Sequence, residues 1–202
     1  MLKELLQNTK LMSRIYQTYE QNKNEILDIV IFGSFVRGKE KPKDIDLLLI
    51  YKSKVNAELS YSIQKEFETF NLKVDLVSKV YSDLFKSAFV ARESYFSEGY
   101  SLVQKGFISE KLGFKPTVLF RYDLSNLNKS ERMRFYYSLY GRNSEGIIKK
   151  LGLTKFSERI LISPIEKSEE VKEYLNNWKI KYLETPILMP SRILESEAFK
   201  ER

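Results

Sequence analysis

The stretch that decides the fold is IVIFGSFVRGKEKPKDIDLLLIYK, residues 29–52. It joins two apolar runs through a glycine, a serine and a basic loop that contains a proline. The runs predict buried strands at residues 26–32 and 45–51, because they are short and rich in isoleucine, leucine and valine. Asp44 and Asp46 stand one residue apart at the head of the second run. Two neighbouring carboxylates on a buried strand call for a positive charge between them.

Residues two apart on a strand point to the same face, so the carboxylates of Asp44 and Asp46 are expected to lie together. Mutual repulsion and burial would protonate one of them unless a cation lies between them. Mg²⁺ prefers such hard oxygen ligands and usually combines a few carboxylates with substrate phosphates. Asp75, in the apolar run LKVDLVS, is a third acid on a predicted strand at residues 72–77. Pairing of this strand with the second would bring Asp75 within reach of the same metal.

An anion site is predicted upstream of the aspartates, where the first strand ends and a short helix or turn begins. Gly33 lets the backbone N–H groups approach a phosphate, and Ser34 adds a hydroxyl. Arg37, one turn later, can place its guanidinium on phosphate oxygens. An anion site followed within about ten residues by a metal site predicts a nucleoside triphosphate with Mg²⁺ as the ligand of both.

The motif GSFVRGKEKPKDIDLLL, followed by KVDLV, resembles the minimal nucleotidyltransferases of the DNA polymerase β-like superfamily. Their pattern is Gly-Ser, a short spacer, Asp-x-Asp and a third aspartate on a later strand. The resemblance covers roughly residues 25–104, and all three acids are present. It implies transfer of a nucleotide from a triphosphate to a hydroxyl, with release of pyrophosphate and with two Mg²⁺ or Mn²⁺ ions.

The resemblance also implies a role for each motif residue. The aspartate pair, Asp44 and Asp46, would hold both ions. Asp75 would complete the catalytic metal and accept the proton of the acceptor hydroxyl. Gly33 and Ser34 would hold the β- and γ-phosphates of the nucleotide.

The amino-acid composition excludes sites that depend on cysteine or histidine and favours a polyanionic partner. The 202 residues include no cysteine and no histidine, which excludes disulfides, thiolate sites and every Ser-His-Asp arrangement. The net charge of +7 favours a polyanionic partner such as nucleic acid or a nucleotide. No apolar run is long enough to cross a bilayer and no signal-peptide core is present, so we expect a cytoplasmic protein without a membrane partner.

Strands interleaved with helices run through both halves of the chain, which predicts an α/β or α+β architecture. We expect a nucleotidyltransferase domain over residues 1–106, with a mixed sheet flanked by helices, and a small second α/β domain over 107–202. A soft boundary is expected at 105–116, where two glycines and a proline interrupt the pattern. Helices are predicted at 2–22 and through 81–99, and the last dozen charged residues are expected to fray.

The second half carries an aromatic and basic run, FYYSLYGRNSEGIIKK. One interpretation is an RNA-contacting surface; the other is that the aromatic residues form the core face of a helix capped by a glycine. The candidate phosphate contacts are Arg132, Arg134, Arg142, Lys149, Lys150 and Arg159. This half is similar to the extension of some archaeal stand-alone nucleotidyltransferase-domain proteins, from which no residue roles are carried over.

These observations favour a Mg²⁺-dependent nucleotidyltransferase whose second domain binds or positions the acceptor. The acceptor stays open among an RNA 3′ end, a protein hydroxyl and a small molecule, and so does the base of the nucleotide. The alternatives are a catalytically silent RNA- or ribosome-binding protein on the same fold, and an antitoxin-type enzyme that modifies a partner protein. A regulatory module that binds a triphosphate without releasing pyrophosphate is a further alternative.

Overall fold

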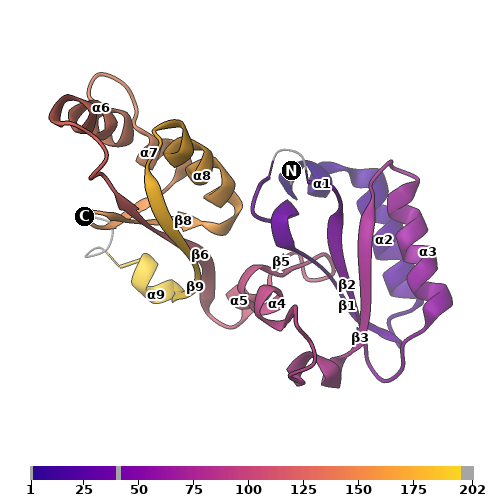
Figure 1. Ribbon diagram of the computed structural model, residues 1–202. Coiled ribbons are helices and arrows are strands. Elements are labelled where there is room, and N and C mark those ends of the chain that lie inside the picture. The colour runs from indigo at the N-terminus through magenta and orange to yellow at the C-terminus, as the bar shows by residue number, and fades with distance from the viewer. Residues whose placement is uncertain (1, 40–41, 197–202) are drawn as a thin grey trace. The chain divides into compact units, whose positions relative to one another are not determined.

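The computed structural model describes residues 2–39 and 42–196 (Figure 1). The chain divides into two compact units, Met1–Leu112 and Gly113–Arg202. Gly106–Phe107 belongs to the first unit, because it pairs with Tyr100–Ser101 in that unit's sheet. Each unit is described by itself below.

The first unit alternates short strands with helices along the chain. Its elements are α1 (Leu2–Gln7), α2 (Thr9–Gln21), β1 (Ile26–Phe32), the 3₁₀ turn η1 (Gly33–Phe35), β2 (Ile45–Tyr51), α3 (Ala57–Glu68), β3 (Val74–Val80), the 3₁₀ helix η2 (Tyr81–Phe85), α4 (Arg92–Glu98), β4 (Tyr100–Ser101), β5 (Gly106–Phe107) and α5 (Ile108–Lys111).

The five strands form one mixed sheet in the order β3-β2-β1-β4-β5. Strand β1 pairs antiparallel with β2 and β4, whereas β2 pairs parallel with β3. The predicted strands at 26–32 and 45–51 are confirmed at both ends. The register places Asp46 opposite Phe32 on one side and beside Asp75 on the other.

Helices cover both faces of this sheet. Helices α2 and α3 lie side by side along one face in Figure 1, with the buried side chains of Ile63 and Phe67 on α3. On the other face, Val30 and Phe32 of β1 pack in one cluster with Leu84 of η2 and with Tyr95 of α4. The prediction of a mixed sheet flanked by helices is therefore confirmed.

Two predicted helices are broken. The helix expected over residues 2–22 is interrupted at Asn8, whose side chain accepts a hydrogen bond from the Leu11 N–H at 3.2 Å and caps α2. The helix expected over 81–99 is split by an irregular segment. In one continuous helix Phe89 would point about 140° away from Leu84, yet both side chains are buried in the same cluster. The chain leaves the helix so that both can reach the sheet.

The second unit packs helices against an antiparallel sheet in the order β7-β8-β6-β9. Its elements are β6 (Phe114–Asp123), α6 (Lys129–Tyr140), α7 (Ile147–Leu151), β7 (Thr154–Ser157), β8 (Ile160–Pro164), η3 (Ile165–Lys167), α8 (Ser168–Asn177), β9 (Lys181–Pro190) and α9 (Ser191–Leu194).

The core of the second unit is aromatic. Tyr122 of β6 contacts Phe135 of α6 with ring centroids 5.6 Å apart, and both side chains are buried. Tyr174 and Trp178, in and directly after α8, pack on the same phenylalanine at 5.8 and 5.6 Å. The interpretation of Phe135 as the core residue of a helix therefore holds.

Two predictions from the sequence concern membrane-spanning helices and fraying at the end of the chain. Within residues 2–39 and 42–196, no helix is both long enough and apolar enough to cross a bilayer. Of the last dozen residues, which were predicted to fray, Ser191–Leu194 form α9, and 197–202 lie outside the described residues.

Candidate active site

The predicted anion site is a tight turn at the end of β1. Gly33 has φ +77°, a backbone conformation that favours glycine, and begins the turn η1. The Gly33 carbonyl accepts hydrogen bonds from the backbone N–H groups of Val36 and Arg37 at 3.1 and 3.3 Å. These bonds fold the chain back sharply, so that the turn stays at the end of the sheet instead of continuing as a strand.

Gly33 is required by its surroundings as well as by its backbone conformation. A β-carbon added at this position would collide with the Asp46 Oδ2 atom and would lie 2.9 Å from the Asp46 Cγ atom. The carboxylate of Asp46 therefore occupies the space that any other side chain would fill. The glycine corner and the aspartate predicted to bind metal are in direct contact.

The other two acids flank Asp46. Asp75 is its register partner on the parallel neighbour β3, and residues paired in this way point to the same face. Asp44 lies in a bend directly before β2 and not on the strand, which begins at Ile45. Its Oδ2 atom is 3.9 Å from the Lys73 ammonium. We call Gly33 and Ser34, together with Asp44, Asp46 and Asp75, the acidic corner.

The three acids affect one another electrostatically. Burial raises the pKa of the Asp46 carboxyl, and the negative charges of Asp44 and Asp75 raise it further. The positive charge of Arg37 opposes this shift in pKa. Asp46 thus carries an unfavourable charge that a cation would relieve, as the aspartate spacing predicts.

Ser34 follows the glycine in the turn and is half-buried. Its carbonyl accepts a hydrogen bond from the Lys39 N–H at 3.2 Å. Its hydroxyl makes no hydrogen bond to any residue of the described part of the chain. The hydroxyl is therefore available to a ligand at the corner.

Arg37 contacts a protein carboxylate that the sequence did not single out. Its Nη1 atom donates hydrogen bonds to both carboxylate oxygens of Glu98, at 2.9 and 2.8 Å. Glu98 ends α4 and is only 3% exposed. The two residues are 61 positions apart in the sequence. The structure therefore ties the predicted phosphate-binding arginine to a buried acid, beside the aspartates whose charge it offsets.

Strand β1 carries a further buried acid, Asp28, which is not part of the acidic corner. Asp28 of β1 is 4% exposed and accepts hydrogen bonds of 2.7 Å from the Ser101 hydroxyl and from the Ile29 N–H. Burial raises the pKa of Asp28 to about 6, although the two hydrogen bonds act against the shift. Both hydrogen-bond donors to Asp28 belong to the protein itself, which indicates that this carboxylate stabilises the fold.

The acidic corner suits a magnesium ion that arrives with its substrate. Within residues 2–39 and 42–196, no three acidic side chains are arranged closely enough to form a metal site by themselves. Mg²⁺ seldom uses such cages and is usually bound by one or two carboxylates together with substrate phosphates. The donor chemistry, three carboxylates beside a phosphate-type turn, fits this mode of binding.

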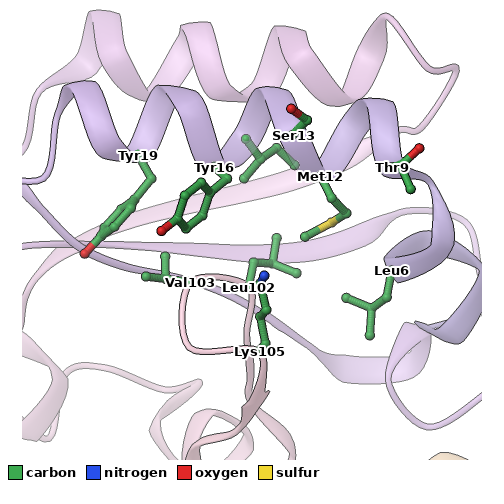
Figure 2. A pocket seen from close by; sticks show the side chains of 10 residues that line it. Leu6, Thr9, Met12, Ser13, Tyr16, Tyr19, Leu102, Val103 and Lys105 are labelled. Carbon is green, nitrogen blue, oxygen red and sulfur yellow. The ribbon is translucent and has the colours of Figure 1, made fainter.

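A separate pocket of about 290 Å³ lies between the first helices and the segment after β4 (Figure 2). Figure 2 shows Met12 and Tyr16 of α2 facing Leu102 and Lys105 across it. The Lys105 ammonium lies 5.7 Å from the centre of the Tyr16 ring. None of the residues predicted for catalysis lines this pocket, so it belongs to no part of the acidic corner.

The predicted nucleic-acid contacts of the second unit are dispersed. The Arg132 Nε atom donates to the carbonyls of Leu124 and Leu127 at 3.2 and 2.9 Å, so this arginine stabilises the start of α6. Arg142 lies 4.7 Å from the Tyr137 ring centre, and the Lys149 ammonium is 3.5 Å from Glu145. Two further residues of the prediction are exposed cations, Arg134 and Lys150.

Residues 14–94, less than half of the chain, match the family described as polymerase beta, nucleotidyltransferase. No curated protein matches the chain.

Several solved structures are similar over part of the chain. A chain of the toxin–antitoxin with AMP-PNP is 19% identical, with a TM-score of 0.35, covering 45% of this chain and 71% of its own. A chain of the tri-AMPylated Shewanella oneidensis HEPN toxin in complex with MNT antitoxin is 18% identical, with a TM-score of 0.32, covering 46% of this chain and 68% of its own. A chain of the toxin–antitoxin MntA-HepT is 18% identical, with a TM-score of 0.32, covering 47% and 71%.

The family match contains the complete set of motif residues: Gly33, Ser34, Arg37, Asp44, Asp46 and Asp75. The resemblance predicted from the Gly-Ser turn and the aspartates is therefore confirmed, and residues 14–94 form a nucleotidyltransferase domain of the polymerase β family.

Proposed function

We propose that the chain is a Mg²⁺-dependent enzyme that transfers a nucleoside monophosphate from a triphosphate to a hydroxyl acceptor. One observation carries the proposal: the Asp46 carboxylate lies against Gly33, with Asp75 in register beside it. A phosphate-type turn and a group of carboxylates thus share one corner. A magnesium triphosphate supplies the matching partners for both.

Each residue of the acidic corner has a distinct task in this proposal. The backbone N–H groups at Gly33 and Ser34, with the Ser34 hydroxyl, bind the β- and γ-phosphates. Asp44 and Asp46 are the residues that would hold Mg²⁺, with Asp75 as the neighbouring carboxylate. The bound metal would neutralise phosphate charge and make the acceptor hydroxyl more acidic.

The transfer itself forms one bond and breaks one. The acceptor oxygen attacks the α-phosphorus, the bond from this phosphorus to the bridging oxygen of the leaving group breaks, and pyrophosphate departs. The acceptor proton passes to the Asp75 carboxylate. Asp75 is exposed and lies on the edge strand β3, where an acceptor has access.

The test is incubation of the full chain with each of the four α-labelled triphosphates, Mg²⁺ or Mn²⁺, and total cellular RNA or protein. We expect pyrophosphate release and label in a macromolecular fraction, with sensitivity to ribonuclease or protease identifying the acceptor. A chain that binds triphosphate but releases no pyrophosphate with any acceptor would contradict the proposal and favour the catalytically silent alternative.

A further inference from the structure

The second unit has a concentration of positive charge that includes only one of the phosphate contacts predicted from the sequence, Arg159. A hollow of about 470 Å³ is lined by Arg121, Arg159, Lys181 and Tyr182, together with Tyr122, Asp123 and Leu183. We call it the basic hollow. Three cations face a single carboxylate there, so the surface is positively charged.

Strand pairing brings these cations together at one end of the sheet. Arg121 of β6 pairs with Leu183 of β9, two residues from Lys181, and the Arg159 carbonyl accepts a hydrogen bond of 3.0 Å from the Tyr122 N–H. Buried Tyr122 points into the core, so its strand neighbour Arg121 faces the opposite side of the sheet. Lys181 is a diagonal neighbour of Arg121 on that side, about 7–8 Å away between Cα atoms.

Most of this charge is not neutralised within the unit. Asp123 accepts hydrogen bonds from the Ser125 N–H and hydroxyl at 3.0 and 2.6 Å, and one at 3.3 Å from Arg159. Arg121 and Lys181 form no ion pair with any described residue. The basic hollow therefore holds three cations and one carboxylate, Asp123, which binds Arg159 and is the register partner of Lys181.

An apolar side chain lies beside the cations. Leu183 is 60% exposed and lies directly across from Arg121, so both face the same side of the sheet. Tyr182 is the register partner of buried Tyr122 and packs on Phe120, on the opposite face. A single phosphate ion needs no such surface. Cations several ångströms apart, next to an apolar side chain, suit a strand of phosphates whose bases are unpaired.

We propose that the basic hollow is a binding site for single-stranded nucleic acid. Arg121, Arg159 and Lys181 contact successive phosphates, and Leu183 packs against a base. The net charge of +7 on the chain draws the strand toward the protein. The site does not depend on nucleotidyl transfer, which uses residues of the other unit.

The test uses the full chain and a fluorescent 12-nucleotide single strand, as RNA and as DNA of the same sequence. Binding is measured by anisotropy from 50 to 200 mM salt. The variant Arg121→Gln/Arg159→Gln/Lys181→Gln is compared with Arg134→Gln/Lys149→Gln/Lys150→Gln, which removes the same charge from α6 and α7. Thermal unfolding shows whether each variant folds.

We expect the hollow variant to bind both strands roughly tenfold or more weakly, and the slope of log affinity against log salt to fall by about 2. The helix variant should keep both values close to those of the natural chain. Replacement of Arg121 and Arg159 by lysine keeps the charge and should largely preserve binding, which tests the proposal even if the glutamine variant unfolds.

Equal losses in the two triple variants would mean binding by overall charge and would overturn the proposal. So would a hollow variant that binds as tightly as the natural chain, or a natural chain that binds a phosphopeptide but no single strand. Asp46→Asn should bind the strand normally, so a failure of the proposed transfer is distinguishable from a failure of this site.

Discussion

The acidic corner and the basic hollow are both charged sites at the end of a sheet, but they are assembled differently. Four of the five residues of the acidic corner lie within residues 33–46, where one strand ends and the next begins. The three cations of the basic hollow come from two strands and the turn before a third, far apart in the chain. Sites of the first kind can be recognised in sequence, whereas sites of the second kind require the strand register.

The strongest test of this comparison is Asp46→Asn. We expect nucleotide transfer to fall at least about 10³-fold, because the substitution removes a carboxylate from a site that needs one to hold its cation. Binding of a single strand in the basic hollow should not change. Label transfer and strand binding, measured on the same preparation, separate the two sites.

Asp28→Asn is the matched control for that substitution. It removes a buried acid from the same sheet, outside the acidic corner, and transfer at pH 7 should persist. Transfer by Asp46→Asn at the natural rate would refute the role of the acidic corner.

Gly33→Ala should have the next largest effect. The added methyl group would meet the Asp46 carboxylate, and φ +77° is unfavourable for alanine. We expect transfer to fall about 10²-fold and stability by about 1–3 kcal/mol. Steady-state kinetics and urea unfolding measure the two effects. Gly152→Ala, another glycine with positive φ but with no atom near the added carbon, should reduce stability alone.

Glu98→Gln probes the Arg37–Glu98 pair, whose members are 61 positions apart in the sequence, just as the cations of the basic hollow come from distant segments. Loss of this carboxylate removes two charge-assisted hydrogen bonds from a largely buried site, which should cost about 2 kcal/mol in unfolding free energy. The double variant Arg37→Gln/Glu98→Gln should lose less than the sum of the single variants, as urea unfolding would show. Additive losses would mean that the pair does not interact.

The change with no expected effect on transfer at pH 7 concerns a pH dependence of stability due to Asp28. Its pKa is about 6 in the folded chain and 3.8 for an unperturbed aspartate, so the folded state binds the proton more tightly. The favourable contribution is complete below pH 4 and is lost as the pH rises to about 6, by about 3 kcal/mol. Asp28→Asn should flatten this part of the profile, measured by unfolding at each pH. An unchanged profile would contradict the assignment to Asp28.

Sequence could predict the acidic corner because its chemistry follows local rules. Apolar runs fixed β1 and β2, and the glycine and the aspartate spacing marked the turn between them. The contact between Gly33 and Asp46 depends on the antiparallel register, which places Asp46 opposite Phe32. Register was not predictable from either run alone, since each is apolar along most of its length.

The residues that sequence did not identify are those whose environment is set by tertiary packing. Glu98 reads as an ordinary polar residue near the end of a helix, and only the packing of α4 on the sheet buries it against Arg37. Arg132 reads as a free surface cation, yet it binds two carbonyls at the start of its own helix. The helix predicted over 81–99 failed for the same reason, because packing on the sheet overrode local helix propensity.

The central claim is that the Gly-Ser turn and the aspartates bind one magnesium triphosphate together. The most direct measurement is anomalous diffraction from crystals grown with Mn²⁺ and a non-hydrolysable triphosphate. We predict a manganese peak between the carboxylates of Asp44 and Asp46, with the β- and γ-phosphates on the backbone of Gly33 and Ser34. A nucleotide bound elsewhere, or manganese that contacts none of the three aspartates, would contradict the account.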